Sequence, residues 1–83
     1  MDLNERTKLL NLLDLYGPLL TVKQQEIVRD HLALDLSFQE IGEAKNLTRS
    51  AIQDSFKKAT DKLLKYEDKL HFLEKLHGKH IDI

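Results

Sequence analysis

The chain has 83 residues, of which 41% are hydrophobic and 33% are charged, and this length suffices for one small domain. Its 13 basic and 14 acidic side chains leave a formal net charge of −1, which argues against the excess positive charge usual among nucleic-acid binders. The absence of cysteine excludes disulfides, thiolate metal sites and a cysteine nucleophile. Because residues 1–5 do not resemble a signal peptide and no apolar run approaches a membrane span, we expect a cytoplasmic protein without membrane contact.

Leucines dominate the first predicted helix, which runs from about Asn4 to Tyr16. Its apolar face has helical spacing and consists of Leu9, Leu12, Leu13 and Tyr16. Two further side chains widen this face, Leu10 and Leu15. The broad face predicts contacts on two sides, and Gly17-Pro18 ends the helix.

Two capping boxes mark the next helices, because a hydroxyl side chain is followed three residues later by Gln or Glu. Thr21 and Gln24 open a second helix, with the expected core residues Ile27, Val28, Leu32 and Leu34. Ser37 and Glu40 open a short third helix, with Ile41 and Ala44 as its apolar residues. Asn46 tolerates the left-handed conformation and is therefore the expected turn residue.

A long fourth helix is predicted to follow Thr48, its N-cap, and to continue as far as Gly78. Its apolar residues are spaced alternately by four and three positions: Ile52, Phe56, Ala59, Leu63, Tyr66, Leu70 and Leu73. We expect the second half of this seam to pack on the first helix or on a second copy of the chain. The candidate interface residues for a homodimer or partner protein are Leu10, Leu15, Leu63, Tyr66, Leu70 and Leu73. Residues 1–77 are predicted to form one domain and residues 78–83 a disordered tail.

Residues 37–56 fit a helix-turn-helix, since a short helix, a three-residue turn and a second helix follow one another. The motif needs a small residue where its helices meet, here Gly42, and buried apolar side chains after the turn. The predicted motif core is Ile41, Gly42, Leu47, Ile52 and Phe56. An ordinary corner between two helices is the alternative interpretation.

The stretch SFQEIGEAKNLTRSAIQDSFKKA resembles the helix-turn-helix of region 4 of bacterial sigma factors. A fuller resemblance, to the YlxM family of small bacterial proteins, extends to YGPLLTVKQQEIV, LDLSFQEIGE and LLKYEDKL. The resemblance implies an all-α fold with a sigma-region-4-like helix-turn-helix and a long C-terminal helix. It also implies a DNA-binding regulatory protein connected with the signal recognition particle pathway, with no catalytic activity assigned. Lys45 and Asn46 depart from the usual pattern, which places Leu and Gly there.

Charge along the chain is uneven, and this asymmetry favours a nucleic-acid role for the fourth helix. Residues 1–47 hold 5 basic and 8 acidic side chains, a net of −3, whereas residues 48–70 hold 6 and 4, a net of +2. The candidate nucleic-acid-binding residues are Thr48, Arg49, Ser50, Gln53, Lys57, Lys58 and Lys62. Lys65 and Lys69 continue a row of lysines from Lys58. The alternative is a solvated face stabilised by the pairs Asp54–Lys58 and Asp61–Lys65.

The sequence indicates no enzyme and no cofactor, because no glycine-rich phosphate loop, nucleophile elbow or paired catalytic carboxylates are present. His77 and His80 are two metal ligands at most and lack a third, so we expect no metal site, and His31 is expected at the rim of the core. Two function hypotheses remain. One is a regulator that binds DNA or the RNA or protein of the signal recognition particle, with no small-molecule substrate. The other is a protein-interaction module that has kept the helix-turn-helix and lost DNA binding.

Overall fold

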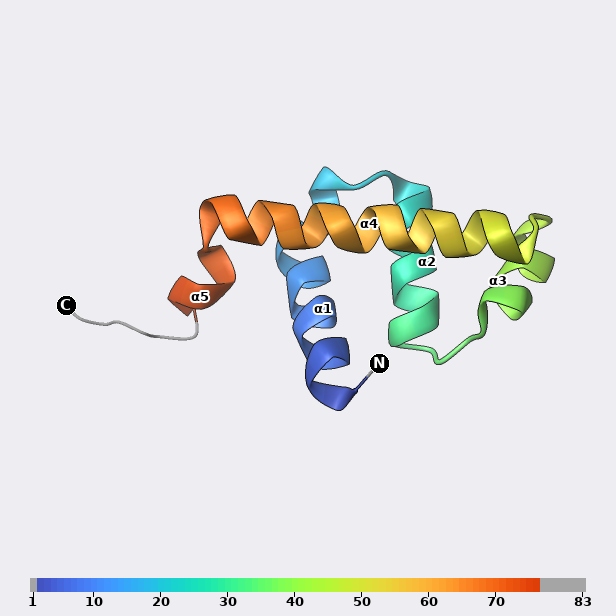
Figure 1. The fold of residues 1–83 in the computed structure, drawn as a ribbon, viewed down its shortest axis with the longest axis horizontal. Helices are drawn as coiled ribbons and strands as arrows, with labels where there is room; N and C mark the ends of the chain where they lie inside the picture. The colour runs from blue at the N-terminus through green and yellow to red at the C-terminus, as the bar shows by residue number, and fades with distance from the viewer. Residues whose placement is uncertain (1, 77–83) are drawn as a thin grey trace.

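The long helix α4 (Arg49–Leu70) organises the fold, because every other α-helix packs against it or continues from it. The computed structural model describes residues 2–76. In Figure 1, α1 (Leu3–Tyr16) and α2 (Val22–Leu32) cross α4 side by side, and the 3-10 turn η1 (Gly17–Leu19) connects them. The short helix α3 (Phe38–Lys45) lies at the N-terminal end of α4. At the C-terminal end of α4, α5 (Phe72–Leu76) folds back beside α1. The predicted all-α helix-turn-helix fold is confirmed.

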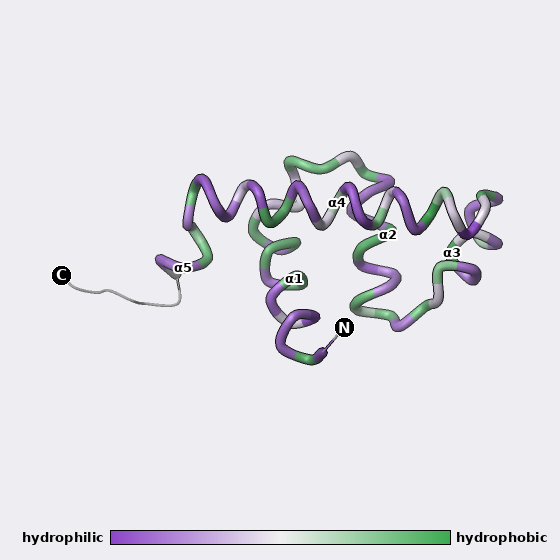
Figure 2. The backbone as a smooth tube through the Cα atoms, in the orientation of Figure 1, coloured by the Kyte–Doolittle hydropathy of each residue, from purple (hydrophilic) through white to green (hydrophobic). Residues whose placement is uncertain are grey.

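One apolar core lies between α4 and the other helices. It contains side chains from α1, α2, α3 and α4 and from Leu20, which follows η1. Figure 2 shows hydrophobic positions alternating with hydrophilic ones along α4, as in an amphipathic helix with one buried face. The buried core residues are Leu9, Leu12, Leu13, Tyr16, Leu20, Ile27, Val28, Leu32, Ile41, Ile52, Phe56, Ala59 and Leu63. The predicted apolar face of the first helix is therefore confirmed, and Leu10 and Leu15 are half-buried against the same core.

The predicted helix starts and the turn are confirmed by their hydrogen bonds. The side-chain oxygens of Thr21 and Ser37 accept from the backbone N–H groups of Gln24 and Glu40. In return, the backbone N–H groups of Thr21 and Ser37 donate to the Gln24 and Glu40 side chains. Asn46 ends α3 in the left-handed conformation, with φ 61° and ψ 43°. These features depend on contacts within three residues, which explains why the sequence alone reveals them.

Two predicted core residues are exposed. Leu34 lies beyond the end of α2 and is 61% exposed, because the chain turns at Asp35, whose φ is 61°. Arg6 holds this turn from α1, with its Nη2 2.7 Å from Asp35 Oδ1. Ala44 is also exposed, on the outer side of the short helix α3.

The prediction that the fourth helix continues to Gly78 is wrong. The helix ends at Leu70, and His71 takes the left-handed conformation, with φ 56° and ψ 29°. Glu67 accepts hydrogen bonds from the backbone N–H groups of Leu73 and Glu74, at 3.0 and 3.1 Å, and thereby starts a new helix. Leu73 consequently belongs to α5, and the apolar seam does not continue straight through Leu70. The predicted tail 78–83, the end of the predicted domain 1–77, and the pair His77 and His80 lie outside the described residues.

Candidate nucleic-acid interface

A close backbone contact fixes the angle between α3 and α4. A Cβ placed on Gly42 would lie 2.5 Å from the backbone oxygen of Leu47, far inside van der Waals contact. The backbone N–H of Leu47 in turn donates to the Gly42 carbonyl at 2.8 Å. Only glycine therefore allows the turn to close on α3, as the helix-turn-helix pattern predicts.

The predicted motif-core residues are buried except for Leu47. Ile41 and Ile52 are fully buried and Phe56 is 9% exposed, whereas the Leu47 side chain is 37% exposed. The backbone of Leu47, and not its side chain, fills the space beside Gly42. The pattern predicted a small residue at Gly42 and a buried side chain at Leu47, and the Leu47 side chain is exposed.

An aromatic cluster, which the sequence reasoning missed, joins α2 to both helices of the motif. The ring of His31 stacks on Phe38 at 4.2 Å between centroids and meets Phe56 edge-on at 4.9 Å. Its Nδ1 lies 2.8 Å from the Leu36 carbonyl oxygen, which fixes the ring. His31 is half-buried, as predicted, and its neighbours make it a packing residue.

A second unpredicted contact explains Lys45, which occupies a position where leucine is usual. Its Nζ lies 2.6 Å from Glu26 Oε1, so an ion pair connects α3 to α2. The hydrogen bond and the positive charge of Lys45 lower the pKa of Glu26. The end of α3 is thus held to the middle of α2 by an exposed polar contact, which is weaker than buried apolar packing.

The start of α4 presents hydrogen-bond donors to solvent. Thr48 Oγ1 accepts from the Ala51 N–H at 3.1 Å, which leaves the hydroxyl proton of Thr48 available for donation. The N–H groups of Arg49 and Ser50 belong to the first turn, where a helix has no internal acceptors. Positive partial charge therefore gathers at this end of a 22-residue helix, which favours an anion.

All seven predicted nucleic-acid-binding residues are exposed, but they lie on more than one side of α4. Gln53 follows Arg49 by four residues and shares its side, whereas Lys58 follows Arg49 by nine residues, about half a turn away. We call the group at the start of the helix the reading face: Thr48, Arg49, Ser50, Gln53 and Lys57. Lys58 and Lys62 belong instead to the row that continues with Lys65 and Lys69.

Ion pairs offset the acidic residues near the reading face. Lys58 Nζ lies 3.0 Å from Asp54 Oδ2, as the sequence predicted. Asp61 pairs with Lys57 at 3.1 Å and not with Lys65, so that part of the prediction is wrong. Both pairs have the i,i+4 spacing, and both are exposed, so each contributes about 0.3–0.5 kcal/mol. Arg49 takes part in no ion pair within residues 2–76 and is available to a phosphate or a guanine.

The residues predicted as a partner interface do not form one free surface. Leu63 is fully buried in the core, so its assignment to an interface is wrong. Tyr66 is half-buried and lies 5.9 Å from the Tyr16 ring, and Leu73 packs against the core from α5. Leu70 is 39% exposed. An interface through the remaining residues stays a prediction.

Comparison with known proteins identifies the family. The UPF0122 family, described as "Putative helix-turn-helix protein, YlxM / p13 like", matches residues 3–82. The chain belongs to the UPF0122 family. The YlxM resemblance inferred from the sequence is thereby confirmed.

Several bacterial members of the UPF0122 family are similar over most of this chain. A UPF0122 protein of Fusobacterium nucleatum is 43% identical over 89% of this chain and 72% of its own length. One of Ureaplasma parvum is 47% identical over 90% of this chain and 76% of its own length. One of Clostridium acetobutylicum is 47% identical over 88% of this chain and 63% of its own length. No solved structure matches this UPF0122 chain significantly.

Proposed function

We propose that this UPF0122 protein is a non-catalytic regulator that binds nucleic acid through the reading face of α4. The observation that carries the proposal is the exposed start of α4, where Arg49 and Gln53 project from a helix anchored by Ile52 and Phe56. Arg can contact guanine or phosphate, and Gln can pair with adenine. The Thr48 hydroxyl and the first N–H groups of the helix supply phosphate contacts. Among the helices of residues 2–76, none has the length and apolar character needed to cross a membrane.

The family resemblance extends this proposal to the signal recognition particle pathway, in which the protein would act as an accessory or regulator. Its binding partner there is the particle's RNA or protein, and DNA is the partner expected from the resemblance to sigma region 4. The overall charge of −1 favours modest affinity with a clear salt dependence over tight binding by one copy.

Fluorescence anisotropy tests the proposal with two labelled probes, a mixed-sequence DNA duplex and the RNA of the signal recognition particle. Arg49→Ala should weaken binding and reduce the salt slope by about one phosphate contact. Lys57→Glu, which reverses a charge on the reading face and leaves Asp61 unpaired, should weaken it further. Lys8→Ala is the matched control, since Lys8 is an exposed lysine on α1.

The outcomes separate the two function hypotheses. If neither probe binds at low salt, or if Lys8→Ala has the same effect as Arg49→Ala, the reading face has no role. A pull-down that recovers a protein without nucleic acid would then favour the interaction-module hypothesis.

A further inference from the structure

The junction between α4 and α5 has features that are compatible with two conformations, one bent and one straight. His71 adopts the left-handed conformation there, which a non-glycine residue enters at a cost. The apolar spacing nevertheless continues through the joint, because Tyr66, Leu70 and Leu73 follow one another at four and three positions. The sequence is therefore compatible with a straight helix at the place where the structure bends.

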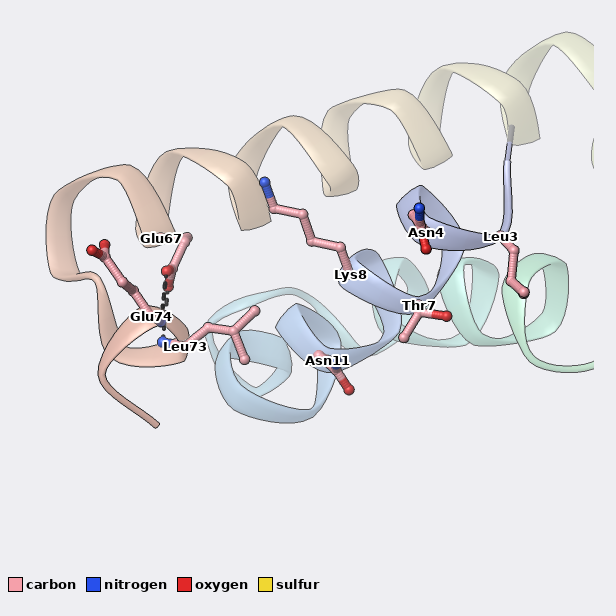
Figure 3. Close-up of a pocket in the computed structure, with 8 residues that line it drawn as sticks. All are labelled: Leu3, Asn4, Thr7, Lys8, Asn11, Glu67, Leu73 and Glu74. Atoms are coloured by element: carbon pink, nitrogen blue, oxygen red, sulfur yellow. Dashed lines mark hydrogen bonds between the residues drawn. The ribbon is translucent and has the colours of Figure 1, made fainter. Parts of the chain in front are cut away.

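Two side chains from outside α5 hold the bend. Glu67 Oε1 accepts from the Tyr16 hydroxyl at 2.7 Å and from the Leu73 N–H at 3.0 Å, and Glu67 Oε2 accepts from the Glu74 N–H. The Tyr16 hydroxyl also accepts from the Phe72 N–H at 3.1 Å. Figure 3 shows the Glu67 carboxylate directed at the first turn of α5, where Leu73 and Glu74 begin the helix, with its hydrogen bonding to α5 dashed.

A straight continuation of α4 would satisfy the same backbone donors in another way. In an uninterrupted α-helix, the N–H groups of Phe72, Leu73 and Glu74 would bond to carbonyls four residues earlier. These three backbone donors are thus satisfied in both conformations, by side-chain oxygens in the bent form and by carbonyls in the straight one. Their balance depends on the cost of His71 in the left-handed conformation and on the contacts that Tyr16 and Glu67 make.

The bent conformation closes one side of a groove on α1. The groove has a volume of about 440 Å³, and α5 contributes Leu73 and Glu74 to its wall (Figure 3). Facing residues from α1 include Thr7 and Asn11. The Tyr16 ring stacks on Phe72 at 6.2 Å, so moving α5 away would uncover Tyr16 and open the groove.

We propose that residues 67–76 switch between this bent conformation and a continuous α4–α5 helix, with the Tyr16–Glu67 contact as the lock. Breaking this contact lengthens α4, uncovers the Tyr16 ring and removes Leu73 and Glu74 from the wall of the groove. The proposal is independent of nucleic-acid binding, since the joint lies at the other end of α4 from the reading face.

Distances between two spin labels test the proposal directly. The chain has no cysteine, so Ser50→Cys and Lys75→Cys, both at exposed positions, provide unique labelling sites. A continuous helix would place their Cα atoms about 38 Å apart, and the bent form brings them closer. Tyr16→Phe and His71→Ala should each raise the ratio of long to short distances about tenfold, whereas His71→Gly should lower it. Lys65→Ala, an exposed substitution on α4, is the control and should leave the ratio unchanged.

The decisive sample is the double variant Tyr16→Phe with His71→Ala. A distance peak near 38 Å that grows in this variant and shrinks in His71→Gly establishes the switch. A distribution without that peak, whether narrow at the short distance or broad, overturns it, because neither contains a continuous helix.

Discussion

The Tyr16 hydroxyl donates a 2.7 Å hydrogen bond to Glu67 and joins two helices across 51 residues of sequence. Burial raises the pKa of Tyr16, and the bond to Glu67 raises it further, so the hydroxyl keeps its proton. Burial also favours a raised pKa for Glu67, but the bonds from Tyr16 and from the Leu73 and Glu74 N–H groups outweigh it and lower the pKa. The contact therefore joins a protonated donor to an ionised acceptor.

Removing the Tyr16 hydroxyl should destabilise the protein measurably. Tyr16→Phe keeps the buried ring but loses a hydrogen bond to a charged acceptor, which should lower the free energy of unfolding by about 2 kcal/mol. Urea unfolding measures this change. Tyr66→Phe is the matched control, because Tyr66 is half-buried beside Tyr16 and its hydroxyl makes no hydrogen bond within residues 2–76. Equal losses in the two variants would contradict the prediction.

Stability should fall in acid because the pKa of Glu67 is lowered in the folded protein. A carboxylate with a lowered folded pKa stabilises the fold above its unfolded pKa, and that contribution is lost as the pH falls through the folded pKa. The free energy of unfolding, measured from pH 7 to pH 3, should therefore decrease less steeply in Glu67→Gln than in the unmodified chain. Asp35 and Glu26 have lowered pKa values too and remain in both proteins, so their contributions cancel in the comparison. Parallel pH profiles would show that Glu67 contributes nothing to this dependence.

The two glycines of the described chain should respond oppositely to alanine. Gly42→Ala would place a Cβ 2.5 Å from a backbone oxygen and should cost about 1–3 kcal/mol, since the turn must move. Gly17→Ala meets Leu13 Cδ1 at an ordinary 3.4 Å, and its φ of −49° suits alanine. It should therefore stabilise the protein by about 0.4–1 kcal/mol. Thermal unfolding of both variants provides the measurement, and a stable Gly42→Ala protein would disprove the close contact.

Two adjacent leucines of α4 test which face of this helix is turned toward the core. Leu63 is fully buried and Leu64 is 42% exposed. Leu63→Ala should cost about 2–5 kcal/mol because it leaves a cavity, and Leu64→Ala should cost about 1 kcal/mol or less. If urea unfolding gives the reverse order, α4 is rotated relative to the arrangement described above.

The sequence predicted those features of the fold that depend on residues close to one another in the chain. The caps at Thr21, Ser37 and Thr48 follow from side-chain contacts within three residues. The turn at Asn46 follows from the tolerance of asparagine for the left-handed conformation, and the apolar periodicity identified most of the core. The break at His71 could not be found in this way. The straight and bent forms share the same apolar spacing, and the choice between them rests on Tyr16, which is distant in sequence.

Two further contacts that the sequence reasoning missed are also long-range. Nothing near Lys45 in the sequence points to Glu26, 19 residues away, and nothing near Asp35 points to Arg6. The burial of the Leu47 side chain was wrongly predicted for a different reason. A pattern of residue types describes side chains, whereas Gly42 accommodates the backbone of Leu47.

The close backbone contact at Gly42 separates most residues that make the turn from those on the reading face, and Thr48 alone belongs to both groups. Asn46, the Leu47 carbonyl and the Thr48 cap shape the turn, and Ile52 and Phe56 anchor the helix, while the exposed side chains of Arg49, Ser50 and Gln53 carry none of this packing. Those three positions can therefore be exchanged as a set with little effect on folding. The recognition residues of the motif can thus be replaced without redesigning the helices that carry them.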